Sequence, residues 1–328
     1  NGEMQHGFSY VQTTTKNGTR YSASKAFLHP IRNRKNLHVV KRSMATKILI
    51  DPSAKNAYGV EFVRNGNRYV VHARKEVILS AGAINSPQLL MLSGVGQRTH
   101  LTGLGIPVIQ DLNVGYNLMD QCGLLVISTI NEHLSLRSRD ILSSINPILN
   151  FLAYHQGPLT SVAGTEVYAF LDSKKVNKSD NSIDIELLFT PASFQNFPFA
   201  YKSVDYTDKF HSLYLKPIEG KHSWNAMGVI MQPKSRGRIT LKSRNPFDKP
   251  SIYHDFYKNP EDMETQLRAI KLIIDLGNTT AFQKLGSRLY DIPVPGCEHL
   301  NFGSDEYWRC AARHVSFCIY HGSGTCKM

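Results

Sequence analysis

Three short runs of alternating apolar and polar residues dominate the first quarter of the chain. LHVVKRSMATKILI (37–50), AYGVEFVR (57–64) and RYVVHA (68–73) are rich in β-branched and aliphatic residues. Asn65-Gly66-Asn67 separates the last two runs, and Asn-Gly in this setting is among the strongest short-range hairpin signals. The pattern predicts an antiparallel meander. Residues 77–80 are continuously apolar up to a serine and predict a strand buried on both faces of a sheet.

Small residues and a helix-start signal follow that predicted strand. Ala81-Gly82-Ala83 carry little side-chain bulk, and Ser86-Pro87 predicts a helix with Ser86 as N-cap and Pro87 at the first helical position, ending near Gly94. A buried strand, a slim turn and a helix start form a usual place for a dinucleotide to approach the backbone. An ordinary tight crossover explains the same pattern equally well, because neither GxGxxG nor a Walker loop is present.

The rest of the chain alternates between strand and helix patterns. Residues 141–154 predict a helix, and RGRITLKS (236–243) predicts a half-buried strand. Asn259-Pro260 predicts the start of the best helix, whose apolar stripe recurs at helical spacing until Gly277. A shorter helix is expected from Ser304 through His314.

Composition adds limits rather than a function. The chain has 328 residues, enough for about two domains of roughly 150 residues each. No apolar run approaches the roughly 18 residues that span a bilayer, so no transmembrane segment is expected. A net charge of +12 fits a solvated basic face, since no zinc-finger spacing or RNA-binding signature suggests nucleic acid as a partner. The first residues, NGEMQHGFSY, hold neither a start methionine nor a signal peptide, which predicts a removed leader or a start inside a longer protein.

The closing stretch CIYHGSGTCKM allows three interpretations. Cys310, Cys318, His321 and Cys326 are ligand types for structural zinc, but no CxxC pair occurs anywhere in the chain. A plain loop with a solvated histidine is the second interpretation. The third is catalytic: glycines at 322 and 324 would let a planar ligand approach the backbone, beside a histidine able to take a proton from a hydroxyl.

Four motifs resemble one family. YHGSGTCKM resembles the HxxGTCxM segment of the glucose–methanol–choline (GMC) oxidoreductases, and GAINSPQLLMLSGVG (82–96) their second signature. VGYNLMD (114–120) is similar to the VGxNLxDH loop, and RGRITLKSRNPFDKP (236–250) to the RGxxxLxSxxP element. The motifs occur in the family's order, and the chain most resembles the quinone-accepting glucose dehydrogenase branch found in insects.

The resemblance implies an FAD-dependent enzyme that oxidises the CH–OH group of an alcohol or of a sugar such as glucose. It implies His321 as the general base and a quinone or oxygen as electron acceptor. It also implies a set of cofactor-binding residues: Ala45, Ser80, Ala81, Gly82, Asn117, Gly324 and Thr325. By the same resemblance a secreted protein is expected. A non-catalytic GMC-like binding protein stays open as an alternative, and a zinc-binding structural module is a weaker one.

The implied fold is α/β (α+β). A Rossmann-like FAD-binding domain with a β-meander is expected over residues 1–110, and a substrate domain with an antiparallel sheet and covering helices over 111–303. Residues 304–328 are expected to return to the flavin. Two departures from the family stand out: Gln121 occupies the place of a histidine, and neither the GxGxxG portion nor the second catalytic residue is present. The chain is therefore expected to be an internal fragment that alone binds FAD poorly and is inactive.

Overall fold

The computed structural model describes residues 5–161, 164–174, 183–191, 194–197 and 200–327. The chain forms two compact units, each assembled from distant stretches of sequence. Unit 1 holds the residues up to Asn33 together with Gln121–Gln232 and Asn259–Ile319. Unit 2 holds Arg34–Asp120, Pro233–Lys258 and Tyr320–Met328. These divisions differ from the expected boundaries, because the first residues belong with the predicted substrate domain and 233–258 with the predicted FAD domain.

The predicted meander is present in unit 2. Strands β4 (Ser43–Ile50), β5 (Ala57–Arg64) and β6 (Asn67–His72) pair antiparallel in that order. Asn65 and Gly66 have φ values of 51° and 80°, the positive pair that the Asn-Gly turn requires. Strand β4 is also tied to the following helix, since the Ile48 amide donates to Ser93 Oγ at 2.8 Å.

The buried strand predicted at residues 77–80 is wrong. None of these residues is in a strand, and Ile78 is 79% exposed. A strand exists only where a neighbour accepts its backbone hydrogen bonds, and no described segment of this chain pairs with residues 77–80. The apolar run thus favours a strand, but no described segment of the chain provides a partner for it.

The helix predicted after the small residues is correct in kind but begins earlier than expected. Helix α1 spans Gly82–Leu92, so Pro87 lies inside it and Ser86 is not its N-cap. Ser86 Oγ instead accepts a hydrogen bond from the Ala81 amide at 3.0 Å. The serine therefore still satisfies a free donor near the helix start, as a cap would, but from within the first turns.

A second small sheet completes unit 2. Strand β12 (Gly237–Thr240) lies between β13 (Ser251–Tyr253) and β7 (Tyr116–Leu118), all antiparallel. As the alternation predicted, Ile239 and Leu241 are buried, with 0% and 6% exposed. They pack with residues of α1, of helix α2 (Arg98–Gly103) and of their connections: Met91, Leu101, Ile106, Val114 and Leu118.

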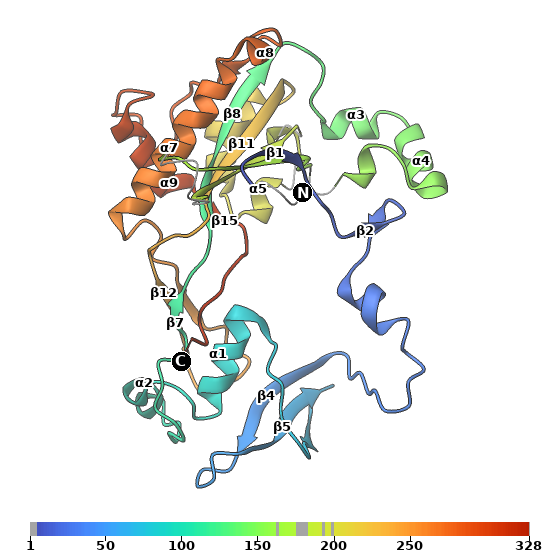
Figure 1. The fold of residues 1–328 in the computed structure, drawn as a ribbon, viewed down its shortest axis with the longest axis vertical. Coiled ribbons are helices and arrows are strands. Elements are labelled where there is room, and N and C mark those ends of the chain that lie inside the picture. The colour runs from blue at the N-terminus through green and yellow to red at the C-terminus, as the bar shows by residue number, and fades with distance from the viewer. Residues whose placement is uncertain (1–4, 162–163, 175–182, 192–193, 198–199, 328) are drawn as a thin grey trace. The chain divides into compact units, whose positions relative to one another are not determined.

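Unit 1 is built on an antiparallel sheet of seven strands among the described residues (Figure 1). Its order is β1-β9-β10-β11-β8-β14, and β15 also pairs with β8. The bounds are Gly7–Tyr10 (β1), Val167–Leu171 (β9), Ile185–Thr190 (β10), His222–Ile230 (β11), Cys122–Ile130 (β8), Arg288–Leu289 (β14) and Phe317–Cys318 (β15). A separate hairpin joins Thr15–Lys16 (β2) to Thr19–Arg20 (β3).

Two helices cover one face of this sheet. Helix α7 (Pro260–Gly277) packs on β8 and β11, and α9 (Asp305–Val315) packs on α7 and β8 (Figure 1). Both starts agree with the prediction, because Asn259 Oδ1 accepts from the Glu261 amide at 2.9 Å and Ser304 Oγ from the Tyr307 amide at 3.1 Å. The covering helices that the resemblance implied are therefore present.

The helix predicted over residues 141–154 is two helices. Helix α3 (Ser138–Leu142) ends before α4 (Asn146–Tyr154) begins, with Pro147 in the first turn of α4. Proline at that position starts a helix rather than continuing one. The remaining helices are short: π-helices at Ser24–Leu28 and His211–Leu215, 3₁₀-helices at Pro158–Thr160, Phe194–Asn196 and Lys216–Ile218, and α-helices at Ala200–Ser203 (α5), Asp208–Phe210 (α6) and Thr280–Gln283 (α8). Across the described part of the chain, every helix is too short or too polar to traverse a bilayer.

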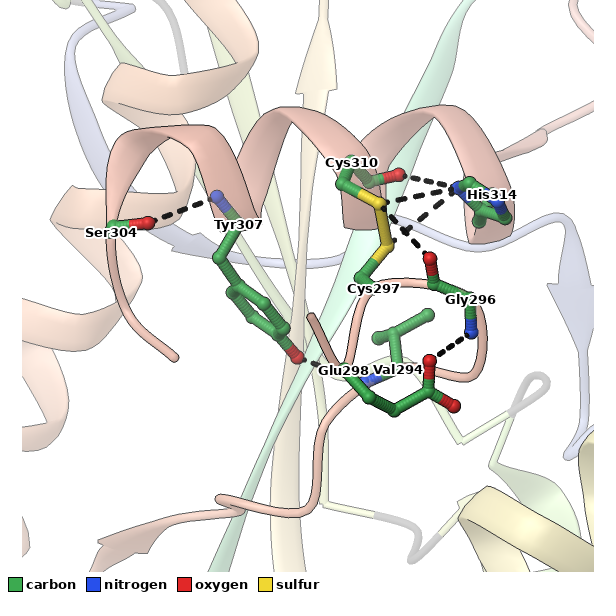
Figure 2. The surroundings of a disulfide bond; sticks show 8 residues. All are labelled: Val294, Gly296, Cys297, Glu298, Ser304, Tyr307, Cys310 and His314. Atoms are coloured by element: carbon green, nitrogen blue, oxygen red, sulfur yellow. Dashed lines mark hydrogen bonds between the residues drawn. A yellow bond between two sulfur atoms is a disulfide. The ribbon is translucent and has the colours of Figure 1, made fainter. Parts of the chain in front are cut away.

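A disulfide joins α9 to the loop before it. Cys297 and Cys310 are bonded, and the loop also meets the helix where Tyr307 Oη accepts from the Val294 amide at 3.0 Å (Figure 2). His314 lies beside the sulfurs, with its Nδ1 donating to the Cys310 carbonyl at 2.9 Å. Cysteine pairing was not predicted, because five cysteines leave the connectivity open.

We expect reduction of this disulfide to lower the free energy of unfolding of unit 1 by about 3 kcal/mol, the value for a closed loop of about 15 residues. Urea unfolding with and without dithiothreitol, followed by tryptophan fluorescence, measures the difference, since Trp224 and Trp308 both lie in unit 1. The Cys297→Ala/Cys310→Ala double variant should lose its response to reductant. Cys326→Ser, which removes a thiol outside the disulfide, should keep it. An unchanged midpoint on reduction of the parent chain would contradict the bond.

Candidate active site

The closing segment of unit 2 runs alongside the loop that resembles VGxNLxDH. Met119 and Ser323 exchange two backbone hydrogen bonds, of 3.0 and 2.8 Å, as in an antiparallel pair. Farther along, the Gly115 amide donates to the Thr325 carbonyl at 2.8 Å. Two of the four sequence motifs, separated by about two hundred residues, are therefore joined by their backbones.

Asp120 connects these segments at the predicted base. Its Oδ1 accepts a hydrogen bond from the His321 backbone amide at 3.0 Å, and the aspartate is only 8% exposed. On its other side, His254 Nδ1 lies 3.9 Å from Asp120 Oδ2, and this nitrogen is buried without a hydrogen-bond partner. The carboxylate thus fixes the backbone from which His321 projects, and it lies next to a second histidine. The His321 side chain itself is exposed, so a ligand can reach it.

Asn117 and Gly324 form the next contact between the two segments. Asn117 Nδ2 donates to the Gly324 carbonyl at 3.3 Å. Gly324 has φ +84°, and a Cβ at this position would lie 2.5 Å from the Asn117 carbonyl oxygen. Only glycine fits there, on both backbone conformation and space. Both residues were predicted as site residues, and the structure brings them together.

Thr325 solves a problem that Pro87 creates in α1. A proline has no N–H, so the carbonyl four residues earlier, that of Ala83, lacks its helical partner. Thr325 Oγ1 donates to this carbonyl at 2.6 Å, and Thr325 is 2% exposed. The closing segment is therefore hydrogen-bonded to the first turn of the helix that follows the small-residue turn.

That turn leaves room for a flat ligand. Ser80, Ala81 and Gly82 are exposed, and a Cβ built on Gly82, at φ +83°, would meet nothing within 4 Å. A Cβ on Gly322 would lie 3.7 Å from Ala83 Cβ, 3.8 Å from Leu118 Cδ1 and 3.9 Å from Asp120 Oδ2, so the closing segment lies close to the start of α1. Gly82, Ile84 and Asn85 in the first turn of α1 are exposed, and backbone amides at a helix start suit the negative charge of a pyrophosphate or phosphate. The residues present therefore fit an FAD molecule.

Ala45 stands apart from the other predicted cofactor residues. It lies in β4 opposite Phe62 of β5 and is exposed, and β4 packs on α1. The described contacts do not join Ala45 to the closing segment. Its predicted role at the adenine therefore stays a prediction.

The structure does not bring together the four residues of the zinc interpretation. Cys310 is bonded to Cys297, and in the described residues the group of ligand-type side chains close enough for a metal is Cys297, Cys310 and His314. A disulfide offers no thiolate to a metal, so this group is not a zinc site while the bond stands. Burial raises the pKa of the Cys326 thiol, which keeps it protonated and inert next to His321.

Gln121, the departure from the family pattern, has a structural role in unit 1. Its side-chain Nε2 donates to the Met231 carbonyl at 2.8 Å. The side-chain amide of Gln121 supplies this donor at every pH. The backbone carbonyl of Gln121 accepts from the Ile319 amide at 3.2 Å.

Comparison with known proteins identifies the motifs. Two family models, both described as GMC oxidoreductase, match residues 1–122 and 233–328. The chain belongs to the GMC oxidoreductase family. The family recognised from the four motifs is thus confirmed, and the matched ranges contain every predicted site residue.

Relatives from insects and fungi extend this finding. The chain is 32% identical to glucose dehydrogenase [FAD, quinone] of Drosophila melanogaster, over 100% of this chain and 50% of the relative. It is 33% identical to ecdysone oxidase of Spodoptera littoralis, over 98% of this chain and 52% of the relative. A formate oxidase variant from Aspergillus oryzae, solved to study FAD modification, superposes with a TM-score of 0.80 at 24% identity, over 99% and 56% of the two chains. The chain therefore spans about half the length of the relatives it matches, and the predicted fold is confirmed.

Sequence reasoning missed two residues of this GMC site. They are Asp120, which the sequence shows only as part of a motif, and His254, which no sequence pattern marks. The motif gave Asp120 a place in the loop but no partner, because the partner is a backbone amide 201 residues away. Pro87 did carry a readable signal: a proline inside a helix announces a free carbonyl that some donor must satisfy.

We expect Thr325→Val to destabilise the protein by about 1–3 kcal/mol, because the Ala83 carbonyl would lose its donor. In a Pro87→Ala background the new N–H can serve that carbonyl, so the same substitution should cost much less. Urea unfolding followed by far-ultraviolet circular dichroism gives the four values of this cycle; both tryptophans lie in unit 1 and would not report on unit 2. Equal costs in the two backgrounds would show that Thr325 does not replace the proline's missing hydrogen bond.

Proposed function

We propose that this GMC family member is part of an FAD-dependent oxidoreductase that oxidises a CH–OH group, with His321 as the general base. The observation that carries the proposal is the anchoring of His321. Its amide is held by the buried Asp120, while its side chain is left exposed on a segment that is hydrogen-bonded to the first turn of α1. A base must be fixed in place and reachable at once, and this arrangement provides both.

The residues of unit 2 divide the work of such a site. The exposed backbone of Ser80, Ala81 and Gly82 would hold the cofactor, with Ala45 toward its adenine. Asn117, Gly324 and Thr325 keep the closing segment against the loop and the helix. Bound FAD supplies the acceptor for the hydride that leaves the substrate carbon. An imidazole nitrogen of His321 accepts the proton of the substrate hydroxyl, which lets the carbonyl form.

The surroundings of the reaction follow from the same proposal. Residues of unit 2 would serve the cofactor and those of unit 1 the substrate, with a quinone or oxygen taking the electrons. The Cys297–Cys310 disulfide supports an oxidising compartment such as the extracellular space, since disulfides seldom persist in the cytosol.

We expect His321→Ala to slow flavin reduction by about 10²- to 10⁴-fold in the full-length, FAD-loaded protein, the usual contribution of a positioned base. Anaerobic stopped-flow bleaching of the flavin by an alcohol substrate measures this step apart from reoxidation. His299→Ala, which removes an exposed histidine of unit 1, is the control and should reduce at the parental rate. Equal rates for His321→Ala and the parent would remove His321 as the base.

The same experiment tests the alternative of a non-catalytic binding protein. If a panel of sugars and apolar alcohols leaves the flavin of the parental protein oxidised, the chain belongs to a binding protein that kept the fold without turnover.

A further inference from the structure

Unit 1 contains an apolar cavity of about 810 Å³ on the face of its sheet that α7 and α9 leave uncovered. Side chains alternate between faces along a strand. Leu124, Leu187 and Ala226 enter the core with α7, whereas their neighbours Leu125, Leu188 and Met227 line the cavity. Met227 lies opposite both Leu125 and Leu188 in the ladder, so the three form one apolar row across β8, β11 and β10.

The other walls are apolar as well. Ile141 and Leu142 of α3 line one side, and Phe317 and Ile319 line another. Among the described lining residues none carries a charge. Cavities of roughly 300–1,000 Å³ accept ligands of drug or cofactor size, so this one holds far more than a simple alcohol such as methanol.

Five of the described lining residues carry a hydroxyl group: Ser138, Ser161, Thr165, Thr190 and Ser203. The two whose hydrogens are bonded are Ser138 and Ser203. Ser138 Oγ donates to the Asn196 carbonyl, and Ser203 Oγ donates to the Ala200 carbonyl at 2.7 Å. Those hydrogens are already committed to the backbone. A sugar surrounded by such walls would leave most of its hydroxyl groups unpaired, at a cost of about 1–3 kcal/mol for each. The walls favour a ligand that is mostly hydrocarbon.

One hydroxyl group of the described lining is both buried and unpaired. Ser161 lines the cavity, and its Oγ is buried without a hydrogen bond. A buried hydroxyl left unpaired is costly, so a polar atom of the ligand would satisfy it. A ligand that reacts at one hydroxyl would then need a second polar group for Ser161.

The chain also links this cavity to the proposed base. Ile319 precedes His321 by two residues in the sequence, and two residues of backbone span at most about 7 Å. We propose, resting on the proposed oxidoreductase function, that the cavity binds the substrate and that this is a bulky, mostly hydrocarbon alcohol of sterol size with one further polar group, rather than a sugar.

Ligand binding to the FAD-free 328-residue chain tests this without any redox step. Equilibrium dialysis with radiolabelled 25-hydroxycholesterol should show saturable binding, displaced by cholesterol and not by excess glucose. The diol should bind more tightly than cholesterol. Ser161→Ala should weaken binding of the diol by about 2- to 10-fold, the effect of one hydrogen bond. The affinity for cholesterol should stay unchanged.

Two substitutions test the location of the site. Leu188→Trp should fill the cavity and weaken the binding of both sterols by at least about tenfold. The control is Leu152→Trp, which changes an exposed residue of α4 outside the lining and should leave the binding unchanged. If Leu188→Trp fails to fold by circular dichroism, Leu142→Asp replaces it, since Leu142 is 69% exposed and tolerates a charge that would still enter the cavity.

The outcomes separate this proposal from the proposed function. Saturable binding of glucose, absence of sterol binding by the folded parent, or sterol binding that ignores the cavity substitutions would each overturn it. Sterol binding by a full-length protein whose flavin stays oxidised with sterols, sugars and simple alcohols alike would support the binding site and sink the proposed function. If the full-length protein oxidises glucose in a reaction that depends on His321 but binds no sterol, the proposed function stands and the sterol proposal falls.

Discussion

The hydrogen bond from Thr325 Oγ1 to the Ala83 carbonyl is the contact on which the site in unit 2 depends. Pro87 leaves that carbonyl without a donor inside the helix, and an unsatisfied buried carbonyl is costly. The helix therefore needs the closing segment, and the closing segment gains a fixed position from the helix. Pro87 removes one hydrogen bond from α1 and thereby helps to fix the position of the segment that carries His321.

Asp120 adds the second fixed point. The hydrogen bond at Thr325 alone would not fix the positions of the preceding residues 321–324. Met119 and Ser323 extend the attachment as a two-way backbone pair, and Asp120 ends it at the His321 amide. Asp120 accepts from the backbone amide of His321, and the side chain of His321 is exposed. His254 Nδ1, 3.9 Å from Asp120 Oδ2, places a second titratable group beside the same carboxylate.

Local signals in the sequence predicted what local chemistry decides. The Asn65-Gly66 turn, the Asn259 and Ser304 caps and the stripe of α7 each depend on residues a few positions apart, and the structure has them all. The strand predicted at residues 77–80 is absent because a strand needs a pairing partner, and no local pattern in the sequence supplies one. The start of α1 failed because Ser86 serves the Ala81 amide from inside the helix. Motif resemblance gathered the site residues, but the distant pairings that hold them, through Asp120 and Thr325, became visible only in three dimensions.

The two faces of the sheet in unit 1 explain why a binding cavity escaped sequence reading. All nine residues of β11 are buried, so the strand shows no alternation that would distinguish a covered face from an open one. On the helix face the centre of β11 is small, at Ala226 and Gly228: a Cβ on Gly228 would lie 2.6 Å from Ala269 Cβ, so the glycine lets α7 approach closely there. On the other face the larger Met227 is buried as well, yet it borders empty space rather than a helix. Close packing on one side removes that face from any role in binding. The apolar row on the other side, bordered by the strand that continues toward His321, is then the surface of the sheet on which substrate selection can act.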